Sequence, residues 1–258
     1  MKRVGQTAAI GLWVAGLWAA LPLAPALAQS AAGKAPPAPA AAHPPAGNPA
    51  PTAPPVDTAK LALPDLSSDE IAARVQAFYD GAKTFQAQFT QHYTIFAYNK
   101  KKESQGRVAF VKPGKMSWRY TSNGNRVVSD GKLLKVYEAD SKQLYEQDMG
   151  KSAYPAALSF LLGEGKLTAS FALKKLNAET VGFKGGYVLV AIPREPTPAY
   201  QKMILYVDGK TFQVRRVQMI DAQKNKNVFD FSEPRVNEAI AASEFAFSAP
   251  AGTQVIKP

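Results

Sequence analysis

Short segments that alternate between apolar and polar residues run through most of the chain and restrict it to an antiparallel β architecture. In "TFQAQFTQHYTIFAYN", residues 84–99, Phe89 and Tyr93 alternate with Gln88 and His92. A period of two over this length predicts a long strand with one face in water.

A second stretch, "FVKPGKMSWRYTSNGNRVVSDGKLLKVY" (residues 110–137), is typical of three strands joined by two turns. Asp130-Gly131 here and Asp208-Gly209 further on are hairpin signals. Later alternation in "TFQVRRVQMI" and "NVFDFS" continues the pattern, with a turn expected at residues 224–227. The middle strand of 110–137 places Met116, Trp118 and Tyr120 on one face and Lys115, Ser117 and Arg119 on the other. The apolar face predicts either a closed core or a pocket for an apolar ligand.

Two segments favour helices. Ser67 and Glu70 fit a capping box ahead of an apolar stripe, and Gly81 suits the helix end. "AYPAALSFLLGEGKL", residues 153–167, predicts a short helical insert between two strand meanders. With many hairpins and few helices, we expect a mainly β fold: one strongly curved antiparallel sheet whose concave face is covered by helices.

The amino-terminal region is typical of a targeting segment. A basic start precedes an apolar run at residues 8–23, and Ala26-Leu27-Ala28 offers a small-x-small cleavage site. We expect residues 1–28 to be a cleavable signal peptide; an uncleaved anchor is the alternative. Residues 29–62 are dominated by Ala and Pro and predict a disordered linker, which leaves 63–258 as the folded domain.

Composition excludes several kinds of chemistry. The chain has no cysteine and two histidines, His43 and His92, which excludes disulfides, a thiol nucleophile and a histidine-rich or cysteine-rich metal site. Motifs for hydrolases, phosphate loops and metalloproteases are absent, so we expect no enzyme, no cofactor and no metal. The formal net charge of +11 favours a membrane surface or a protein as partner over nucleic acid, which export argues against. A basic surface that is merely solvated is the alternative, and the commonest explanation of such a charge.

Five stretches, in this order, give the chain a resemblance to a known family: "FQAQFTQ", "GRVAFVKPGKMSWRY", "VVSDGKLLKVY", "YPAALSFLLG" and "FAFSAPAGTQVI". K-P-x-x-x-x-W-x-Y followed by S-D-G-x-x-L-x-x-Y is the most specific part. Together they span most of residues 71–256 and resemble the periplasmic outer-membrane lipoprotein carrier proteins, the LolA family.

The resemblance implies an open, or half, antiparallel β-barrel with a lid of short α-helices over its concave face. It also implies a monomeric periplasmic carrier without catalytic activity. Such a carrier takes acylated lipoprotein cargo from an inner-membrane ABC lipoprotein transporter and passes it to an outer-membrane lipoprotein acceptor.

The resemblance and the strand parity together assign a lipid-binding cavity. Its predicted lining is Phe89, Val108, Phe110, Met116, Trp118, Tyr120, Leu134, Val136, Leu158, Leu161 and Leu162. Met and aromatic side chains adapt to acyl chains of variable shape. The alternative is that these residues fill an ordinary barrel core.

Lys112 stands where the family commonly has an arginine that holds the lid through helix carbonyls. The resemblance therefore implies a lid latch at Lys112, although lysine lacks the planar fork of arginine. A lysine that extends to solvent at a strand end is the alternative. Lys135 is a departure, because the family usually has an apolar or aromatic residue there.

Three other functions remain open. The same fold could carry another lipid or glycolipid, or serve as an envelope-stress domain that senses lipidated ligands. An esterase is disfavoured by the missing nucleophile motifs.

Overall fold

The computed structural model describes residues 63–149, 165–197 and 199–257. Its α-helices are α2 (Ser68–Gly81) and α4 (Leu167–Ser170), and its 3-10 turns are η2 (Phe96–Tyr98), η5 (Glu179–Val181) and η6 (Ala242–Phe245). The strands of the first meander are β1 (Thr84–Ile95), β2 (Lys100–Val111), β3 (Lys115–Tyr120), β4 (Arg126–Asp130), β5 (Leu133–Glu138) and β6 (Gln143–Asp148). The later strands are β7 (Phe171–Leu176), β8 (Gly186–Pro193), β9 (Lys202–Asp208), β10 (Val214–Ile220), β11 (Lys226–Val236) and β12 (Gln254–Ile256).

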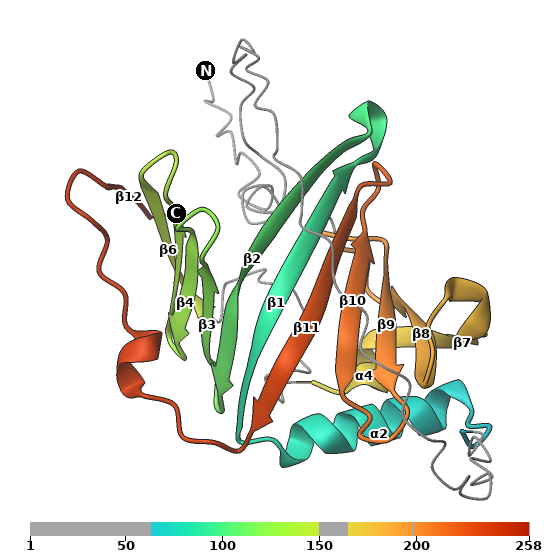
Figure 1. Cartoon of the computed structure of the whole chain (residues 1–258). Coiled ribbons are helices and arrows are strands. Elements are labelled where there is room, and N and C mark those ends of the chain that lie inside the picture. Colours follow the sequence, from blue (N-terminus) through green and yellow to red (C-terminus); the bar gives the residue numbers. More distant parts are fainter. Residues whose placement is uncertain (1–62, 150–164, 198, 258) are drawn as a thin grey trace, which may run out of the picture. The chain divides into compact units, whose positions relative to one another are not determined.

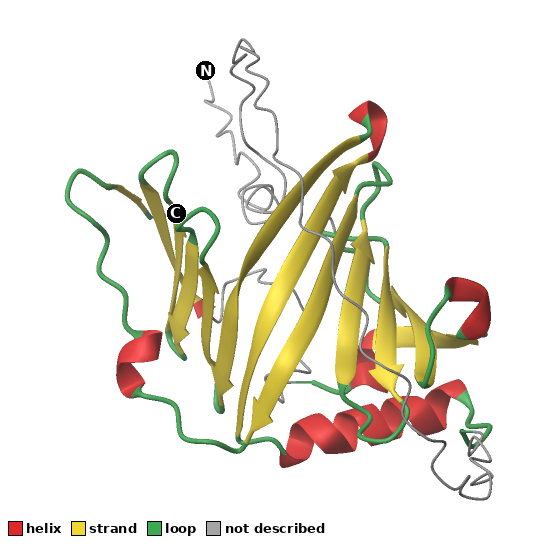
Figure 2. Cartoon of the chain, in the orientation of Figure 1, coloured by secondary structure: helices red, strands yellow, loops and turns green. Residues whose placement is uncertain are grey.

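All these strands belong to one curved sheet of twelve strands (Figures 1 and 2). Their order is β12-β6-β5-β4-β3-β2-β1-β11-β10-β9-β8-β7. The two meanders join at the centre, where β1 pairs with β11 and Phe89 lies opposite Phe231. Within the described residues β7 and β12 are the edges and do not pair, so the sheet is open. The predicted open antiparallel architecture is confirmed, with the exception that β12 runs parallel to β6.

The α2 helix begins with the predicted capping box. The Ser67 hydroxyl accepts the Glu70 N–H at 3.2 Å, and the Glu70 carboxylate accepts the Ser67 N–H at 2.8 Å. A cap of this kind stabilises a helix by about 1 kcal/mol. As expected, the helix ends at Gly81.

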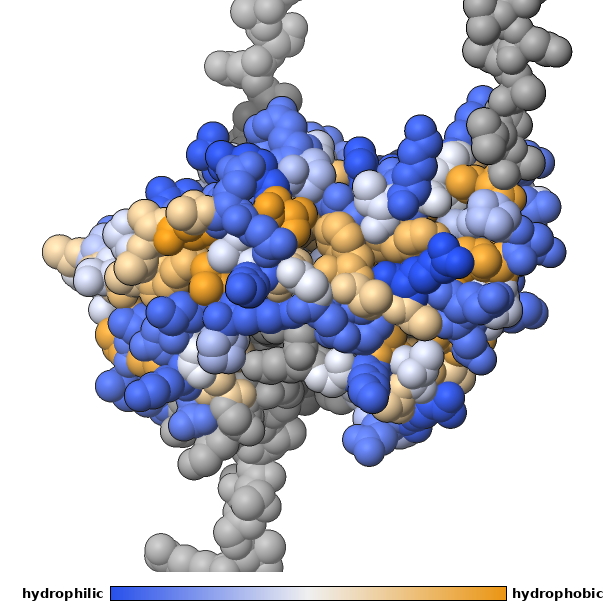
Figure 3. Space-filling model, turned by 90° about the horizontal axis from the view of Figure 1, so that it is seen from below, coloured by the Kyte–Doolittle hydropathy of each residue, from blue (hydrophilic) through white to orange (hydrophobic). Residues whose placement is uncertain are grey.

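One stripe of α2 packs on what we call the inner face of the sheet. Ile71, Val75 and Tyr79 are buried in the same cluster as the inward side chains of the strands. The Tyr79 hydroxyl accepts the backbone N–H of Val214 at 3.2 Å, and burial raises the pKa of Tyr79 far above its usual range. Figure 3 views the molecule from below, the side on which α2 lies in Figure 1. On this side hydrophilic residues are interrupted by apolar patches.

The two Asp-Gly turns form the predicted hairpins. Asp130 accepts the N–H groups of Lys132 and Leu133 at 2.8 and 2.9 Å, and these bonds lower its pKa. Gly131 has φ of 98°, a conformation that favours glycine. Asp208-Gly209 begins the longer connection from β9 to β10, where Asp208 accepts the N–H groups of Lys210 and Thr211 at 3.0 and 2.9 Å.

Two other expectations about local structure have different outcomes. The turn predicted at residues 224–227 lies earlier, because Asp221 accepts the N–H of Asn225 at 2.9 Å and β11 already begins at Lys226. Most of the helical insert predicted at 153–167 lies outside the described residues.

Candidate functional site

Eight predicted cavity residues lie in one buried apolar cluster on the inner face, which comes from β1, β2, β3 and β5. They are Phe89, Val108, Phe110, Met116, Trp118, Tyr120, Leu134 and Val136. The strand register explains the grouping: Val108 lies opposite Trp118, and Phe110 opposite Met116. Leu158, Leu161 and Leu162 lie outside the described residues.

Aromatic rings form the centre of this cluster. The Phe89 ring centroid is 5.2 Å from that of Trp118 and 5.0 Å from that of Tyr120, both edge-on. Trp118 also meets Phe229 edge-on at 5.5 Å, and Phe231 lies 6.2 Å away. Edge-to-face contacts of this kind add to the stabilisation from burial.

The sequence analysis missed Phe229 and Phe231 as part of this site. Their alternation in "NVFDFS" indicated a strand, but only the pairing of β11 with β1 brings that strand beside Phe89. The far half of the sheet extends the apolar face further, with side chains that include Leu189, Met203, Leu205, Val217 and Met219.

Gly106 makes room for the ring of Phe89. It lies opposite Phe89 on one side and Tyr120 on the other. A Cβ at Gly106 would come 2.8 Å from the Phe89 ring and 2.1 Å from the carbonyl oxygen of Arg119. Glycine is therefore required for the close approach of the aromatic side chains at this point.

The inner face becomes polar towards the β1–β2 turn. Beyond Phe89 on β1 comes Gln91, which donates to the Asn227 side chain at 2.9 Å. Both are buried, as is Ser104 opposite Gln91. This face therefore passes from apolar to polar along one strand.

Lys112 reaches the carboxyl end of α2. Its ammonium donates to the carbonyl oxygen of Tyr79, and the carbonyl oxygen of Asp80 lies at 3.3 Å. The last carbonyls of a helix have no partner within the helix and carry partial negative charge. One cation thus connects the end of β2 to the helix that covers the inner face.

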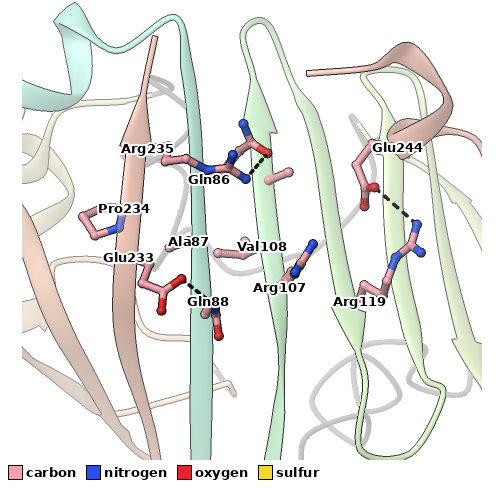
Figure 4. Close-up of a pocket in the computed structure, with 11 residues that line it drawn as sticks. Gln86, Ala87, Gln88, Arg107, Val108, Arg119, Glu233, Pro234, Arg235 and Glu244 are labelled. Carbon is pink, nitrogen blue, oxygen red and sulfur yellow. Dashed lines mark hydrogen bonds and ion pairs between the residues drawn. The ribbon is translucent and has the colours of Figure 1, made fainter. Parts of the chain in front are cut away.

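The opposite, outer face of β1, β2, β3 and β11 carries a polar groove of about 600 Å³ (Figure 4). Three arginines line it: Arg107, Arg119 and Arg235. Arg107 and Arg119 are direct cross-strand neighbours, and Arg119 has Arg126 on its other side. Like charges in such a row repel each other.

Glu244 of η6 supplies the opposing charge. Its carboxylate lies 3.2 Å from Arg119, 3.4 Å from Arg126 and 2.6 Å from the hydroxyl of Ser117. Burial and the charge of Arg119 lower the pKa of the Arg126 guanidinium, while Glu244 opposes that shift. The carboxy-terminal segment is thereby fixed on the outer face.

Lys135 also belongs to the outer face. It donates to the carbonyl oxygen of Phe247 at 3.1 Å and lies 3.5 Å from Glu146. Strand parity turns its neighbours Leu134 and Val136 inward. The departure at Lys135 therefore leaves the apolar inner face uninterrupted.

His92 is half-exposed on the outer face, 3.6 Å from Glu103. Among the described residues there is no group of acidic and histidine side chains suited to a metal ion. In that same part of the chain, no helix has the length and apolar character needed to cross a membrane.

The comparisons with known proteins agree on one family. The family model "Outer membrane lipoprotein carrier protein LolA" matches residues 80–248. The outer-membrane lipoprotein carrier protein of Chromobacterium violaceum is 30% identical over 200 residues, which cover 77% of this chain and 92% of that protein. Its counterpart in Methylibium petroleiphilum is 31% identical over 186 residues, covering 70% of this chain and 87% of that protein.

Among solved structures, a LolA superfamily protein from Nitrosomonas europaea covers 71% of this chain and 99% of its own. The identity is 12% and the TM-score 0.39, a level too low to add to the sequence matches. The family model and the curated relatives are sufficient: this chain belongs to the LolA family of outer-membrane lipoprotein carrier proteins.

Proposed function

We propose that the protein is a periplasmic carrier that holds the acyl chains of lipoproteins against its inner face and shuttles them from the inner to the outer membrane. Residues 1–28 direct export, residues 29–62 form a linker, and residues 63–258 bind the cargo. The inner-membrane donor is an ABC lipoprotein transporter and the recipient is an outer-membrane lipoprotein acceptor. The carrier works as a monomer and catalyses no reaction.

One observation carries this proposal: the apolar inner face is continuous across both meanders. The rings of Phe89, Trp118 and Phe229 come from β1, β3 and β11 and are in mutual contact. A buried methylene is worth about 0.8 kcal/mol, so acyl chains need an extended apolar surface once they leave a membrane. Apolar contacts need no hydrogen-bond partner, so they can be exchanged for contacts with an acyl chain.

The polar end of the inner face fits the remainder of the cargo. A lipoprotein anchor joins acyl chains to a polar glyceryl group and a polypeptide. With the chains beside Phe89 and Trp118, the polar part lies near Gln91 and Asn227, whose amide groups can hydrogen-bond to it.

Lys112 is the proposed lid latch. Its contacts with the carbonyls of Tyr79 and Asp80 hold the end of α2 to the sheet. Lys112→Leu removes both contacts and should change cargo uptake and release, whereas Lys112→Arg preserves them. Equal transfer of a lipoprotein by both variants would contradict the proposed latch role of Lys112.

Native mass spectrometry tests the cargo directly. The full chain is expressed in a Gram-negative host, recovered from the periplasm without detergent, and then denatured to release what it holds. A lipoprotein or acylated peptide bound one to one supports the carrier. A phospholipid or glycolipid instead would assign a different cargo to the same face. An empty protein that takes up no lipidated peptide would make the inner face an ordinary core.

A further inference from the structure

The turn between β1 and β2 projects beyond the strands beside it (Figure 1). On one side, β3 ends at Tyr120 opposite Gly106, so the first residues of β2 extend past it. On the other side, β11 begins at Lys226 opposite Thr94. The turn η2 therefore forms a convex tip, which we define as residues 95–102 together with the adjoining β10–β11 turn at 221–226.

Two aromatic side chains are exposed on this tip. Phe96 is 57% and Tyr98 74% exposed, the two highest values among the large hydrophobic residues of the described chain. The exposure is imposed by a defined local structure. The Phe96 N–H donates to the Asn225 side chain at 3.0 Å, and Asn99 ends the turn in the left-handed conformation with φ of 47°.

Five lysines belong to the same tip. Lys100, Lys101 and Lys102 are consecutive and exposed on β2, and Lys224 and Lys226 are exposed on the neighbouring turn. The Lys224 ammonium lies 5.5 Å from the centre of the Phe96 ring. Within the described residues, none of the five forms an ion pair.

The acidic groups nearby have other partners. Glu103 lies 3.6 Å from His92. Asp221 accepts backbone N–H groups of its own turn, from Gln223 and Asn225 at 2.9 Å. With five lysines and one acid, Asp221, the tip carries a formal net charge of +4 around two exposed aromatic rings.

We propose that this tip docks the protein on membrane surfaces rich in anionic phospholipid. Aromatic rings are favoured at the level of the lipid headgroups, and clustered lysines are attracted to an anionic surface. A convex projection enters a bilayer interface without a matching cavity, whereas a protein partner would need a socket for it. β1 runs from this tip to Phe89, so docking also places the polar end of the inner face nearest the membrane.

The absence of cysteine allows a site-specific test with the full chain. Tyr98→Cys carries an environment-sensitive fluorophore, and vesicles of phosphatidylcholine are compared with vesicles that also contain phosphatidylglycerol. We expect a blue shift and at least tenfold stronger partitioning on the anionic vesicles, weakened by high salt. Lys100→Gln, Lys101→Gln and Lys102→Gln together should abolish the preference.

Val181→Cys with the same fluorophore is the matched control. Val181 is 39% exposed in η5, at the opposite end of the sheet, where Gly186 pairs with Asp208 at the end of β9. This control should show no shift, even if the amino-terminal segment binds the vesicles. No shift at position 98, an equal shift at both positions, or a shift unaffected by the lysine substitutions would overturn the proposal. A shift that appears only with an added acidic protein would overturn it as well.

Because the test uses protein without added cargo, its outcome is independent of whether the inner face binds lipoproteins.

Discussion

The inner and outer faces of strands β2 to β5 are both covered, but by different chemistry. Inside, rings and aliphatic chains such as Trp118 and Leu134 form apolar contacts that need no hydrogen-bond partner. Outside, Ser117 and Arg126 are buried under η6, where one carboxylate, that of Glu244, contacts both. The difference shows that burial alone does not identify a binding face. Apolar contacts can form with many apolar partners, whereas the outer hydrogen bonds and ion pairs fit a single segment of the chain itself.

Removing the Trp118 side chain should cause the largest loss of stability, and this loss tests how fully the inner face is packed. Trp118→Ala should destabilise the protein by about 3–5 kcal/mol, because a fully buried indole is replaced by a cavity. Its neighbour on the outer face, Arg119, has a side chain that is 51% exposed, and Arg119→Ala should cost about 1 kcal/mol or less. Denaturant titration of both variants measures the difference. Equal losses would contradict the distinction between the two faces.

Gly106→Ala should have the second largest effect and lower the free energy of unfolding by about 3 kcal/mol. The added methyl would lie 2.1 Å from the Arg119 carbonyl oxygen and 2.8 Å from the Phe89 ring, so backbone or ring must move. Gly81→Ala is the control, since nothing lies within 4 Å of a Cβ at the end of α2. Thermal unfolding should separate the two variants clearly. A wild-type melting temperature for Gly106→Ala would mean that the inner face is loosely packed there.

On the outer face, Glu244→Gln should lower the free energy of unfolding by about 1–2 kcal/mol. The variant can keep the hydrogen bond to Ser117 but leaves Arg119 and Arg126 without their counter-charge. Glu238→Gln is the matched control, because Glu238 pairs with Arg235 at an exposed site. Chemical denaturation at low and high salt measures both. The prediction fails if the two substitutions have the same effect, or if lipid binding is lost in Glu244→Gln.

The smallest effect on stability should come from substitution of Asp130, on the outer side of the β4–β5 turn. Backbone N–H groups of Leu133 and Lys132 lower the pKa of this carboxyl in the folded state. Its contribution to stability is therefore present above the unfolded pKa of about 4 and is lost as pH falls through the lower folded value. In Asp130→Asn the decrease of stability below pH about 4 should be shallower. Stability measured between acidic and neutral pH checks this, and an unchanged acid slope would contradict it.

Local patterns predicted much of the fold. The alternation around Phe89 and Trp118 gave the inward side chains, and the Ser67–Glu70 box gave the start of α2. The pairing of β1 with β11 depends on contacts between distant parts of the chain, which periodicity does not contain. For the same reason Phe229 was recognised as a strand residue but not as part of the site.

The outer face was harder to predict than the inner one. The stretch "FAFSAPAGTQVI" contributed to the family resemblance, yet the place of Phe245 and Phe247 over β3 to β5 depends on the contacts of Glu244 with Arg119 and Arg126. Lys135 departs from the apolar or aromatic residue that is usual in the family. Its contact with the Phe247 carbonyl shows that it belongs to the attachment of the carboxy-terminal segment.

The pairing of β1 with β11 has a consequence for the order of folding. As the chain is made from its amino-terminal end, β1 to β6 are complete long before β11 exists, so the middle strand of the finished sheet remains an unprotected edge. The far edge at β6 stays open longer still, until β12 pairs with it. Exposed strand edges of this kind invite pairing between chains. We therefore expect slow, late closure of the sheet and a need for protection from self-association until β12 has been delivered.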